Sequence, residues 1–223
     1  MLNQMNGNTK TAILQPPAAY SGNTFAMNQP LPRFVKRLMD VVLAMLMILF
    51  IAPWLFTIVA VFIVLDSRGN PFFIQKRTGR NLKTFYCIKF RTMVLNNDSH
   101  RIQVQVNDSR ITRTGHFLRN HHIDELPQAF NVLMGSMSIV GPRPHMLRQH
   151  VLFSRMSPDY NTRHSVKPGM TGLAQVRGFH GMVHSAEHYY DRLNSDLEYI
   201  QNWSLMTDLR IFLLTTYQTI FLR

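Results

Sequence analysis

The stretch that decides the fold runs from residue 121 to residue 144 and reads HHIDELPQAFNVLMGSMSIVGPRP. It contains two adjacent carboxylates, Asp124 and Glu125, followed by apolar residues at helical spacing. Pro127 suits a first helical turn, where its missing N–H costs little, and Gly135 suits a helix end. The pattern therefore predicts a short helix that starts at the two acids and ends near Gly135.

Two arginines flank the acidic pair. Arg119 precedes it, and Arg143 follows it between two prolines that stiffen the backbone. A helix N-terminus attracts anions, and a guanidinium group matches phosphate oxygens in pairs. This arrangement indicates chemistry on a phosphate ester. The structural alternative is that Asp124 and Glu125 are ordinary first-turn residues that cap a helix and face its dipole.

The composition bounds the partners. The chain has 223 residues, with 24 Lys and Arg against 12 Asp and Glu, and a formal net charge of +12. Such an excess favours anionic partners: nucleic acid, acidic lipid head groups or phosphorylated substrates. Nucleic-acid binders interleave aromatic residues with a basic stripe and avoid central acids, so we expect no nucleic-acid partner. The single cysteine, Cys87, excludes an intramolecular disulfide, and the histidines lack zinc-site spacing.

The N-terminal part divides into two segments. Residues 1–32 are polar without apolar periodicity, and we predict a disordered tail. Residues 33–66 are predicted to be a membrane segment, because Val41 to Leu65 carries no charge and is long enough to enter a bilayer core. Pro53 lies at its centre, and basic residues stand on both flanks. A re-entrant helix hairpin broken at Pro53 keeps both flanks on the cytoplasmic side, whereas a kinked spanning helix is the alternative.

Residues 67–223 are predicted to form one cytosolic catalytic domain at the membrane interface, α+β and mostly helical. Within residues 70–95, apolar residues alternate on both sides of a turn at Gly79–Arg80–Asn81, which indicates a β-hairpin. Lys89 and Arg91 share one face of its second strand. That face either meets phosphate or is the solvated face of a half-buried strand.

Three further segments carry weaker signals. Residues 96–110 are polar and are predicted to form a loop over the active region. Residues 145–157 read as an amphipathic helix that either lies at the membrane interface or packs on the core. Residues 186–222 are helical in pattern, and the closing apolar helix at 209–222 is too short to span, so it packs or lies at the interface.

A second loop region is rich in basic residues. Residues 163–178 (RHSVKPGMTGLAQVRG) are punctuated by glycine and proline, which force turns and let backbone approach a ligand closely. Lys167 and Arg177 add positive charge there, together with Arg163. We therefore predict that Lys167 and Arg177 contribute to phosphate or substrate binding.

Short motifs are spread over residues 33–223. They are KRLMD (36–40), QKRTG (75–79), KFRTM (89–93), RITRTGHFLR (110–119), DELPQ (124–128), SIVGPRP (138–144), KPGMTG with AQV (167–176) and NWS (202–204). In this order, the motifs resemble the bacterial sugar transferase family, the monotopic phosphoglycosyl transferases that load a sugar phosphate onto a polyprenyl-phosphate carrier. The resemblance implies the re-entrant hairpin as well.

The resemblance implies roles for individual residues. Asp124 would be the nucleophile that attacks the β-phosphate of a nucleotide diphosphate sugar and holds the phosphosugar covalently. Glu125 would be a Mg²⁺ or phosphate partner or would handle a proton. Arg119 and Arg143 match the phosphate-binding arginines of the family. The Mg²⁺ cofactor, at Asp124 and Glu125, is implied by the family alone, because Mg²⁺ leaves no strong motif.

The resemblance also implies the setting. The donor would be a UDP-sugar, the acceptor undecaprenyl phosphate, and the place the bacterial cytoplasmic (inner) membrane, with the catalytic domain facing the cytosol. The C-terminal arrangement, with RGFHG at 177–181, looks like the hexose-1-phosphate members (glucose or galactose). The reaction would initiate exopolysaccharide or other glycoconjugate synthesis. A homodimer or contacts with polysaccharide assembly proteins stay open.

The chain departs from the family pattern at several positions. Before Asp124 this chain has His121–His122, where the family more usually has Lys or Arg followed by Thr and Ser. At the hairpin break, the residue before the proline is Ala52. Leu173 stands where Trp is frequent and Arg177 where Asn is frequent, so the identity of the donor is the least defined property. The competing hypothesis is a non-catalytic, membrane-tethered basic binding or scaffold protein. The intact Asp124–Glu125 pair argues against it.

Overall fold

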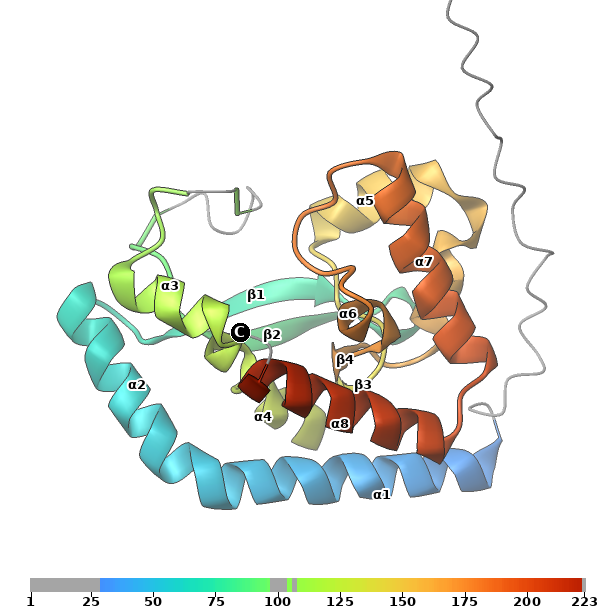
Figure 1. Ribbon diagram of the computed structural model, residues 1–223, viewed down its shortest axis with the longest axis horizontal. Coiled ribbons are helices and arrows are strands. Elements are labelled where there is room, and N and C mark those ends of the chain that lie inside the picture. Colours follow the sequence, from blue (N-terminus) through green and yellow to red (C-terminus); the bar gives the residue numbers. More distant parts are fainter. Residues whose placement is uncertain (1–28, 97–103, 106–107, 222–223) are drawn as a thin grey trace, which may run out of the picture.

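The computed structural model describes residues 29–96, 104–105 and 108–221 (Figure 1). The protein is α+β and mostly helical, as predicted. Most of the tail predicted at 1–32 lies outside the described residues, and the first helix begins at Pro30 rather than at residue 33. The helices are α1 (Pro30–Leu46), α2 (Ala52–Asp66), α3 (Arg113–Asn120), α4 (Gln128–Leu133), α5 (Leu147–Met156), α6 (Leu173–Val176), α7 (Ala186–Gln201) and α8 (Leu205–Phe221). The strands are β1 (Phe72–Thr78), β2 (Thr84–Phe90), β3 (Ser138–Val140) and β4 (Gly169–Thr171).

The long apolar segment is a single helix with a bend between α1 and α2 (Figure 1). The bend contains a π-helical turn, Met47–Ile51, which ends two residues before Pro53. Proline cannot donate to the carbonyl of the preceding turn and its ring crowds that carbonyl, so the helix widens and kinks there. By length and composition Pro30–Asp66 could cross a membrane. The break lies where the sequence predicted it, and the choice between re-entry and spanning stays a prediction.

Buried polar side chains tie α1 to the rest of the domain. Lys36 Nζ donates to Asp208 of α8 at 2.6 Å and to the carbonyl of Val140 at 3.1 Å. Asp208 is fully buried and also accepts from the Tyr199 hydroxyl at 2.8 Å and the Trp203 indole at 3.1 Å. The carboxylate of the buried pair is thus surrounded by donors, which a buried ion pair requires.

The other polar residues of the KRLMD motif make the same attachment further along the helix. Asp40 accepts from the Ser138 hydroxyl of β3 at 2.9 Å. Arg37 donates to the carbonyls of Val132 and Leu133 at 2.6 and 2.8 Å. These carbonyls belong to the last turn of α4, where a helix leaves them without partners. The motif therefore holds α1 against the elements that carry the acidic pair.

The β-hairpin predicted within residues 70–95 is confirmed. Strands β1 and β2 pair antiparallel, with Phe73 opposite Lys89 and Gln75 opposite Cys87. Their turn is a 3₁₀ segment, Arg80–Leu82. Because side chains alternate along a strand, Phe73, Gln75, Cys87 and Lys89 face the same side of the hairpin.

Two distant loops meet in a short parallel sheet that the sequence did not reveal. Strand β3 pairs with β4, with Ser138 opposite Gly169 and Val140 opposite Thr171. A Cβ atom at Gly169 would lie 2.1 Å from the backbone nitrogen of Gly141. Glycine is needed here because the two backbones touch. The GPRP loop that follows β3 is thereby fixed against the KPG turn that precedes β4.

Helices α5 and α7 contribute to a second, aromatic core cluster. Phe153 of α5 packs with Tyr160, with Tyr189 of α7 and with two leucines of α7. Packing on the core, one of the two alternatives for residues 145–157, therefore occurs at Phe153. An additional location at a membrane interface stays a prediction.

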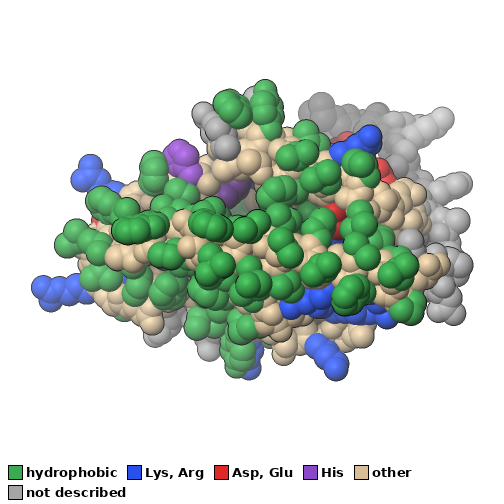
Figure 2. Space-filling view, turned by 90° about the horizontal axis from the view of Figure 1, so that it is seen from below, with side chains coloured by type: hydrophobic (Ala, Val, Ile, Leu, Met, Phe, Trp, Pro, Cys, Tyr) green, Lys and Arg blue, Asp and Glu red, His purple; other side chains and the backbone are tan. Residues whose placement is uncertain are grey.

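One face of the protein is covered by exposed apolar side chains (Figure 2). A continuous apolar surface of this kind marks a membrane or protein contact. It is formed by the outer sides of α1 and α2, and α8 exposes further apolar residues. Its large members include Phe34, Leu38, Met45, Leu49, Phe50, Trp54, Ile58, Val61, Phe62 and Leu65, with Leu209, Leu213, Leu214, Tyr217 and Phe221 on α8.

Candidate active site

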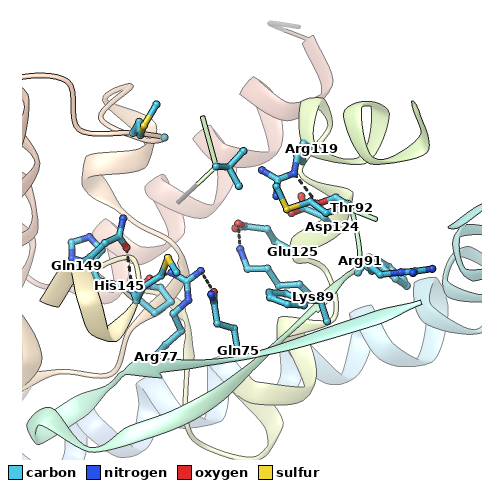
Figure 3. A pocket seen from close by; sticks show the side chains of 18 of the residues that line it. Gln75, Arg77, Lys89, Arg91, Thr92, Arg119, Asp124, Glu125, His145 and Gln149 are labelled. Atoms are coloured by element: carbon cyan, nitrogen blue, oxygen red, sulfur yellow. Dashed lines mark hydrogen bonds and ion pairs between the residues drawn. The ribbon is translucent and has the colours of Figure 1, made fainter. Parts of the chain in front are cut away.

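A cavity of about 440 Å³ lies above the β-hairpin, with the acidic pair on one wall (Figure 3). Residues from β1, β2, α3, the GPRP loop, α5 and α7 line it. Asn96, Val104 and Gln105 of the predicted covering loop are among them, and the remainder of that loop is partly outside the described residues. Of the predicted site residues, the cavity brings together Lys89, Arg91, Arg119, Asp124, Glu125 and Arg143.

The acidic pair lies in a 3₁₀ turn, Ile123–Glu125, just before α4. The sequence predicted that the helix starts at the acids, but α4 starts at Gln128, with Pro127 as its N-cap. His122 precedes the turn in the left-handed conformation at φ 54°. This reversal separates the acids from α3 and aims them at the cavity. The acids thus face the cavity from a turn and do not cap an α-helix.

Glu125 is held by two cations. Arg143 Nη1 donates to Oε2 at 2.9 Å and Nη2 to Oε1 at 2.5 Å, and Lys89 Nζ donates to Oε1 at 2.5 Å. Burial alone would raise the pKa of Glu125, but Arg143 and Lys89 hold it well below its usual range. Glu125 is therefore ionised and fully engaged.

Asp124, unlike Glu125, is not held by cations among the described residues. It is 7% exposed, and within the described part of the chain no side chain forms an ion pair with it or donates a hydrogen bond to it. Burial, reinforced by the neighbouring charge of Glu125, raises the pKa of Asp124 to about 6. Adjacent carboxylates whose environments push their pKa values apart are a sign of divided chemical roles. Asp124 has the free oxygens that a nucleophile needs.

Two arginines reach the cavity from different elements. Arg119 comes from α3, whose N-terminus is capped by the Thr112 hydroxyl, and its Nε donates to the Thr92 hydroxyl at 2.7 Å. Burial lowers the pKa of Arg119. Arg143 comes from the GPRP loop, and its backbone carbonyl accepts from Arg163 at 2.8 Å. Arg163 is itself fixed by a buried ion pair with Asp196 at 2.7 Å.

Lys89 and Arg91, which were predicted to share one face of the second hairpin strand, point in different directions. Lys89 points to the acidic pair, so the face predicted for phosphate does belong to the cavity. Arg91 lies beyond the end of β2, and its guanidinium donates to the carbonyls of Ser67 and Arg68 at 2.5 and 2.8 Å. Figure 3 shows it directed away from Asp124 and Glu125. Arg91 therefore closes the end of α2 and does not reach the acids.

Lys167 and Arg177, predicted as substrate ligands, are not among the residues that line the cavity. Arg177 forms an exposed ion pair with Glu198 at 2.6 Å. Lys167 lies beside Gly135, near Arg37. Lys167 belongs to the KPG turn, in which the Gly169 N–H donates to the carbonyl of Pro142 in the GPRP loop at 3.0 Å.

The cavity has polar residues that sequence reasoning did not select. Arg77 donates to the Pro144 carbonyl at 3.0 Å and to Gln75 Oε1 at 2.6 Å. Both lie on the strand face that carries Lys89, so the hairpin register would have identified them. Arg192 of α7 donates to the carbonyls of Phe179 and Gly181 at 2.8 and 3.0 Å. No local pattern in the sequence marks Arg192.

The donor set fits Mg²⁺ only in part. Among the residues that the structure describes, no group of three or more His, Cys, Asp or Glu side chains could hold a metal. Mg²⁺ commonly uses one or two carboxylates together with substrate phosphates. Asp124 offers free oxygens for this, whereas both oxygens of Glu125 already accept from cations.

The sequence was compared with protein families and with known proteins. The profile of the family described as bacterial sugar transferase matches residues 31–222. Three similar proteins are named UDP-glucose:undecaprenyl-phosphate glucose-1-phosphate transferase. The one from Klebsiella pneumoniae is 42% identical over 184 residues, which is 82% of this chain and 39% of that protein. The one from Escherichia coli K12 is 44% identical over 187 residues, 83% of this chain and 40% of that protein.

The third, from Caulobacter vibrioides, is 44% identical over 191 residues, 83% of this chain and 71% of that protein. The chain thus spans about two fifths of the length of the first two relatives. The profile match includes all but the first residue of α1, the acidic pair, the GPRP loop and all of α8. The chain belongs to the bacterial sugar transferase family.

Proposed function

We propose that the chain is an enzyme that transfers a hexose-1-phosphate from a UDP-sugar to undecaprenyl phosphate. This transfer would be the first step in the synthesis of exopolysaccharide or another glycoconjugate. One observation carries this proposal: of two adjacent buried carboxylates, Glu125 is held by two cations, whereas Asp124 has no side-chain partner among the described residues. The names of the three relatives support the donor and acceptor classes.

In the first step, an Asp124 carboxylate oxygen attacks the β-phosphorus of the UDP-sugar. The new oxygen–phosphorus bond forms as the bond from that phosphorus to the bridging oxygen breaks, and UMP leaves with the electron pair. Arg119 and Arg143 lie where they can neutralise the charge of the phosphoryl oxygens. The product is a phosphosugar held on Asp124.

In the second step, a phosphate oxygen of undecaprenyl phosphate attacks the same phosphorus. The bond to Asp124 breaks, the carboxylate is restored, and undecaprenyl diphosphate sugar is released. Glu125 acts through its ion pairs in this scheme, because it holds Arg143 and Lys89 in position. This favours a positioning role for Glu125 over proton handling.

Mg²⁺ belongs to the proposal as a cofactor. Asp124 is the residue that would hold it together with the diphosphate, and Glu125 would take part only by giving up a bond to Lys89 or Arg143. When bound, the ion would neutralise phosphate oxygens.

The apolar face explains how a soluble donor and a lipid acceptor would meet. We propose that α1 and α2 insert as a re-entrant hairpin into the bacterial inner membrane, with α8 at its surface and the cavity on the cytosolic side. The bend at Pro53 and the attachment of both α1 and α2 to the same domain support this topology. Polyprenyl chains would then approach along the apolar face (Figure 2).

The experiment uses the full chain in detergent with Mg²⁺, and compares UDP-glucose with UDP-galactose. The expected results are that repeated UMP release, beyond one equivalent per protein, requires undecaprenyl phosphate, and that all UMP release is lost in Asp124→Asn. With donor labelled in the β-phosphate and acceptor omitted, label should stay on the wild-type protein and not on Asp124→Asn. Arg177→Ala is the matched control and should behave as wild type. Folded wild-type protein that releases no UMP from any UDP-sugar would instead indicate a binding or scaffold protein.

A further inference from the structure

We propose that His145 contacts the substrate directly, and that its Nε2–H donates a hydrogen bond to the α-phosphate of the nucleotide at the end of the cavity away from Asp124. This inference rests on the proposed function, because it assigns one end of the same cavity. His145 follows the GPRP motif and was not selected from the sequence. It lines the cavity although it is only 4% exposed.

The contacts of the imidazole fix where its proton lies. Nδ1 of His145 is 2.7 Å from the Tyr160 hydroxyl and 3.0 Å from Nη1 of Arg163. A guanidinium can only donate, so Nδ1 must accept. The neutral ring then carries its proton on Nε2. Arg163 cannot turn away, because its Nε and Nη2 both donate to Asp196, at 3.0 and 2.7 Å.

The resulting Nε2–H has no protein partner in the described part of the chain, although it is buried. A buried N–H without an acceptor is costly, and such groups in native structures call for an explanation. An oxygen supplied by a ligand in the cavity would satisfy it. The Nδ1 side is occupied by Tyr160 and Arg163, whereas the buried Nε2–H is left without an acceptor in the described part of the chain.

The surroundings determine which kind of oxygen fits. Arg77 and Arg192, two other cavity residues near His145, donate to backbone carbonyls and to an amide oxygen, and form no ion pair within 4.0 Å among the described residues. Burial and the charges of Arg163 and Arg192 keep the pKa of His145 well below its usual range, so the ring stays a neutral donor. A donor-rich wall with unneutralised guanidinium groups favours an anionic oxygen.

The positions of the side chains labelled in Figure 3, together with the proposed first step, favour one phosphate of the nucleotide. Arg119, Asp124 and Glu125 lie on one side of the cavity, and Arg77, His145 and Gln149 lie on the other. With the β-phosphorus beside Asp124, the leaving UMP extends away from the acid. Its α-phosphate is the anionic group that would reach His145, whereas the sugar carries no charge.

Two single substitutions separate the two nitrogens of the ring. His145→Asn keeps an acceptor near the Nδ1 position for Tyr160 and Arg163 but lacks the reach of Nε2. His145→Gln places an amide N–H near the Nε2 position. We would measure the Kd of UDP and of UMP without turnover, in the same detergent, and the melting temperature of each variant. The expected result is that Asn weakens UMP binding about tenfold and that Gln recovers most of the loss.

Three results would overturn the assignment. Unchanged UMP and UDP binding in a folded His145→Asn protein would show a purely structural role. Unchanged UDP binding with a raised KM for UDP-glucose would place His145 on the sugar. Equal loss in Asn and Gln would argue against a donor at Nε2. Wild-type protein that binds UDP but releases no UMP would contradict the proposed transfer and leave the contact standing, so the two failures are distinguishable.

Discussion

Arg143 and Glu125 meet through two contacts, Nη1 to Oε2 at 2.9 Å and Nη2 to Oε1 at 2.5 Å. Lys89 adds a third contact to the same carboxylate. The residue before it in the chain, Asp124, receives none of these donors. Two neighbouring acids are thus expected to respond in opposite ways when their charge is removed.

Removing the charge of Asp124 should stabilise the protein. Its pKa is raised to about 6, so its contribution to stability is fully present below the unfolded value near 3.8 and is lost as the pH rises through about 6. At pH 8 the ionised side chain is therefore unfavourable. Asp124→Asn is expected to raise the free energy of unfolding by up to about 2 kcal/mol, measured by thermal melting in detergent. A lower melting temperature at pH 8 would contradict this.

Removing the charge of Glu125 should destabilise the protein. Glu125→Gln leaves Arg143 and Lys89 without a counter-charge in a partly buried site, at a cost of about 2 kcal/mol. Glu198→Gln is the matched control, because its ion pair with Arg177 is exposed and should be worth less than about 1 kcal/mol. Equal effects of the two substitutions would show that the Glu125 pairs add little.

The rate should follow the ionisation of Asp124. We expect kcat/KM for the UDP-sugar to rise about tenfold per pH unit below pH 6 and to level off above it, because only the carboxylate attacks. Glu125 should not appear in this range, since its pKa lies well below its usual value. The measurement is UMP release between pH 5 and 8 in buffers of constant ionic strength. A flat profile would exclude Asp124 as the titrating group.

Arginines inside and outside the cavity should differ in effect. Arg119→Ala and Arg143→Ala are expected to lower kcat/KM by about a hundredfold or more, because each removes a cation next to the reacting phosphate. Arg177→Ala and Lys167→Ala should change it by less than about threefold, since neither lines the cavity. If Arg177→Ala lost activity while its stability stayed normal, Arg177 would have to contribute to substrate binding after all.

The Lys36–Asp208 pair should be essential for folding rather than for chemistry. Lys36→Met leaves the fully buried Asp208 without its cation, and we expect a loss of about 3–5 kcal/mol in unfolding free energy. Lys83→Met, in the exposed hairpin turn, is the control and should be near neutral. A small effect at Lys36 would indicate that Tyr199 and Trp203 suffice to hold Asp208.

Local signals in the sequence predicted the elements near the site well. Pro53 marked the bend, alternation marked the β-hairpin, and the acids between two arginines marked the cavity wall. These features depend on neighbours in the chain, so their pattern is readable. The helix was predicted to start at Asp124 and Glu125, whereas α4 starts at Gln128 after a 3₁₀ turn. A 3₁₀ turn and the first turn of an α-helix share residue preferences, so the sequence does not distinguish them.

Long-range contacts could not be predicted in the same way. Arg177 and Arg163 carry the same charge in the same basic segment, yet one is exposed beside Glu198 and the other is buried under Arg143. Which of the two arginines is buried depends on the pairing of β3 with β4 and on the packing of α7. Arg192 was missed for the same reason, since its place in the cavity depends on where α7 packs.

Asp66, the last residue of α2, accepts a hydrogen bond from the backbone N–H of Thr114 in the first turn of α3, at 2.7 Å. Val59 and Ile63 of α2 pack with Leu118 of α3, one residue before Arg119. The bent apolar helix is thereby packed directly against the helix that carries Arg119. In the proposed membrane topology, a change in bilayer thickness that altered the depth or tilt of α2 would shift α3 as well, and the turnover rate would then depend on the surrounding lipid.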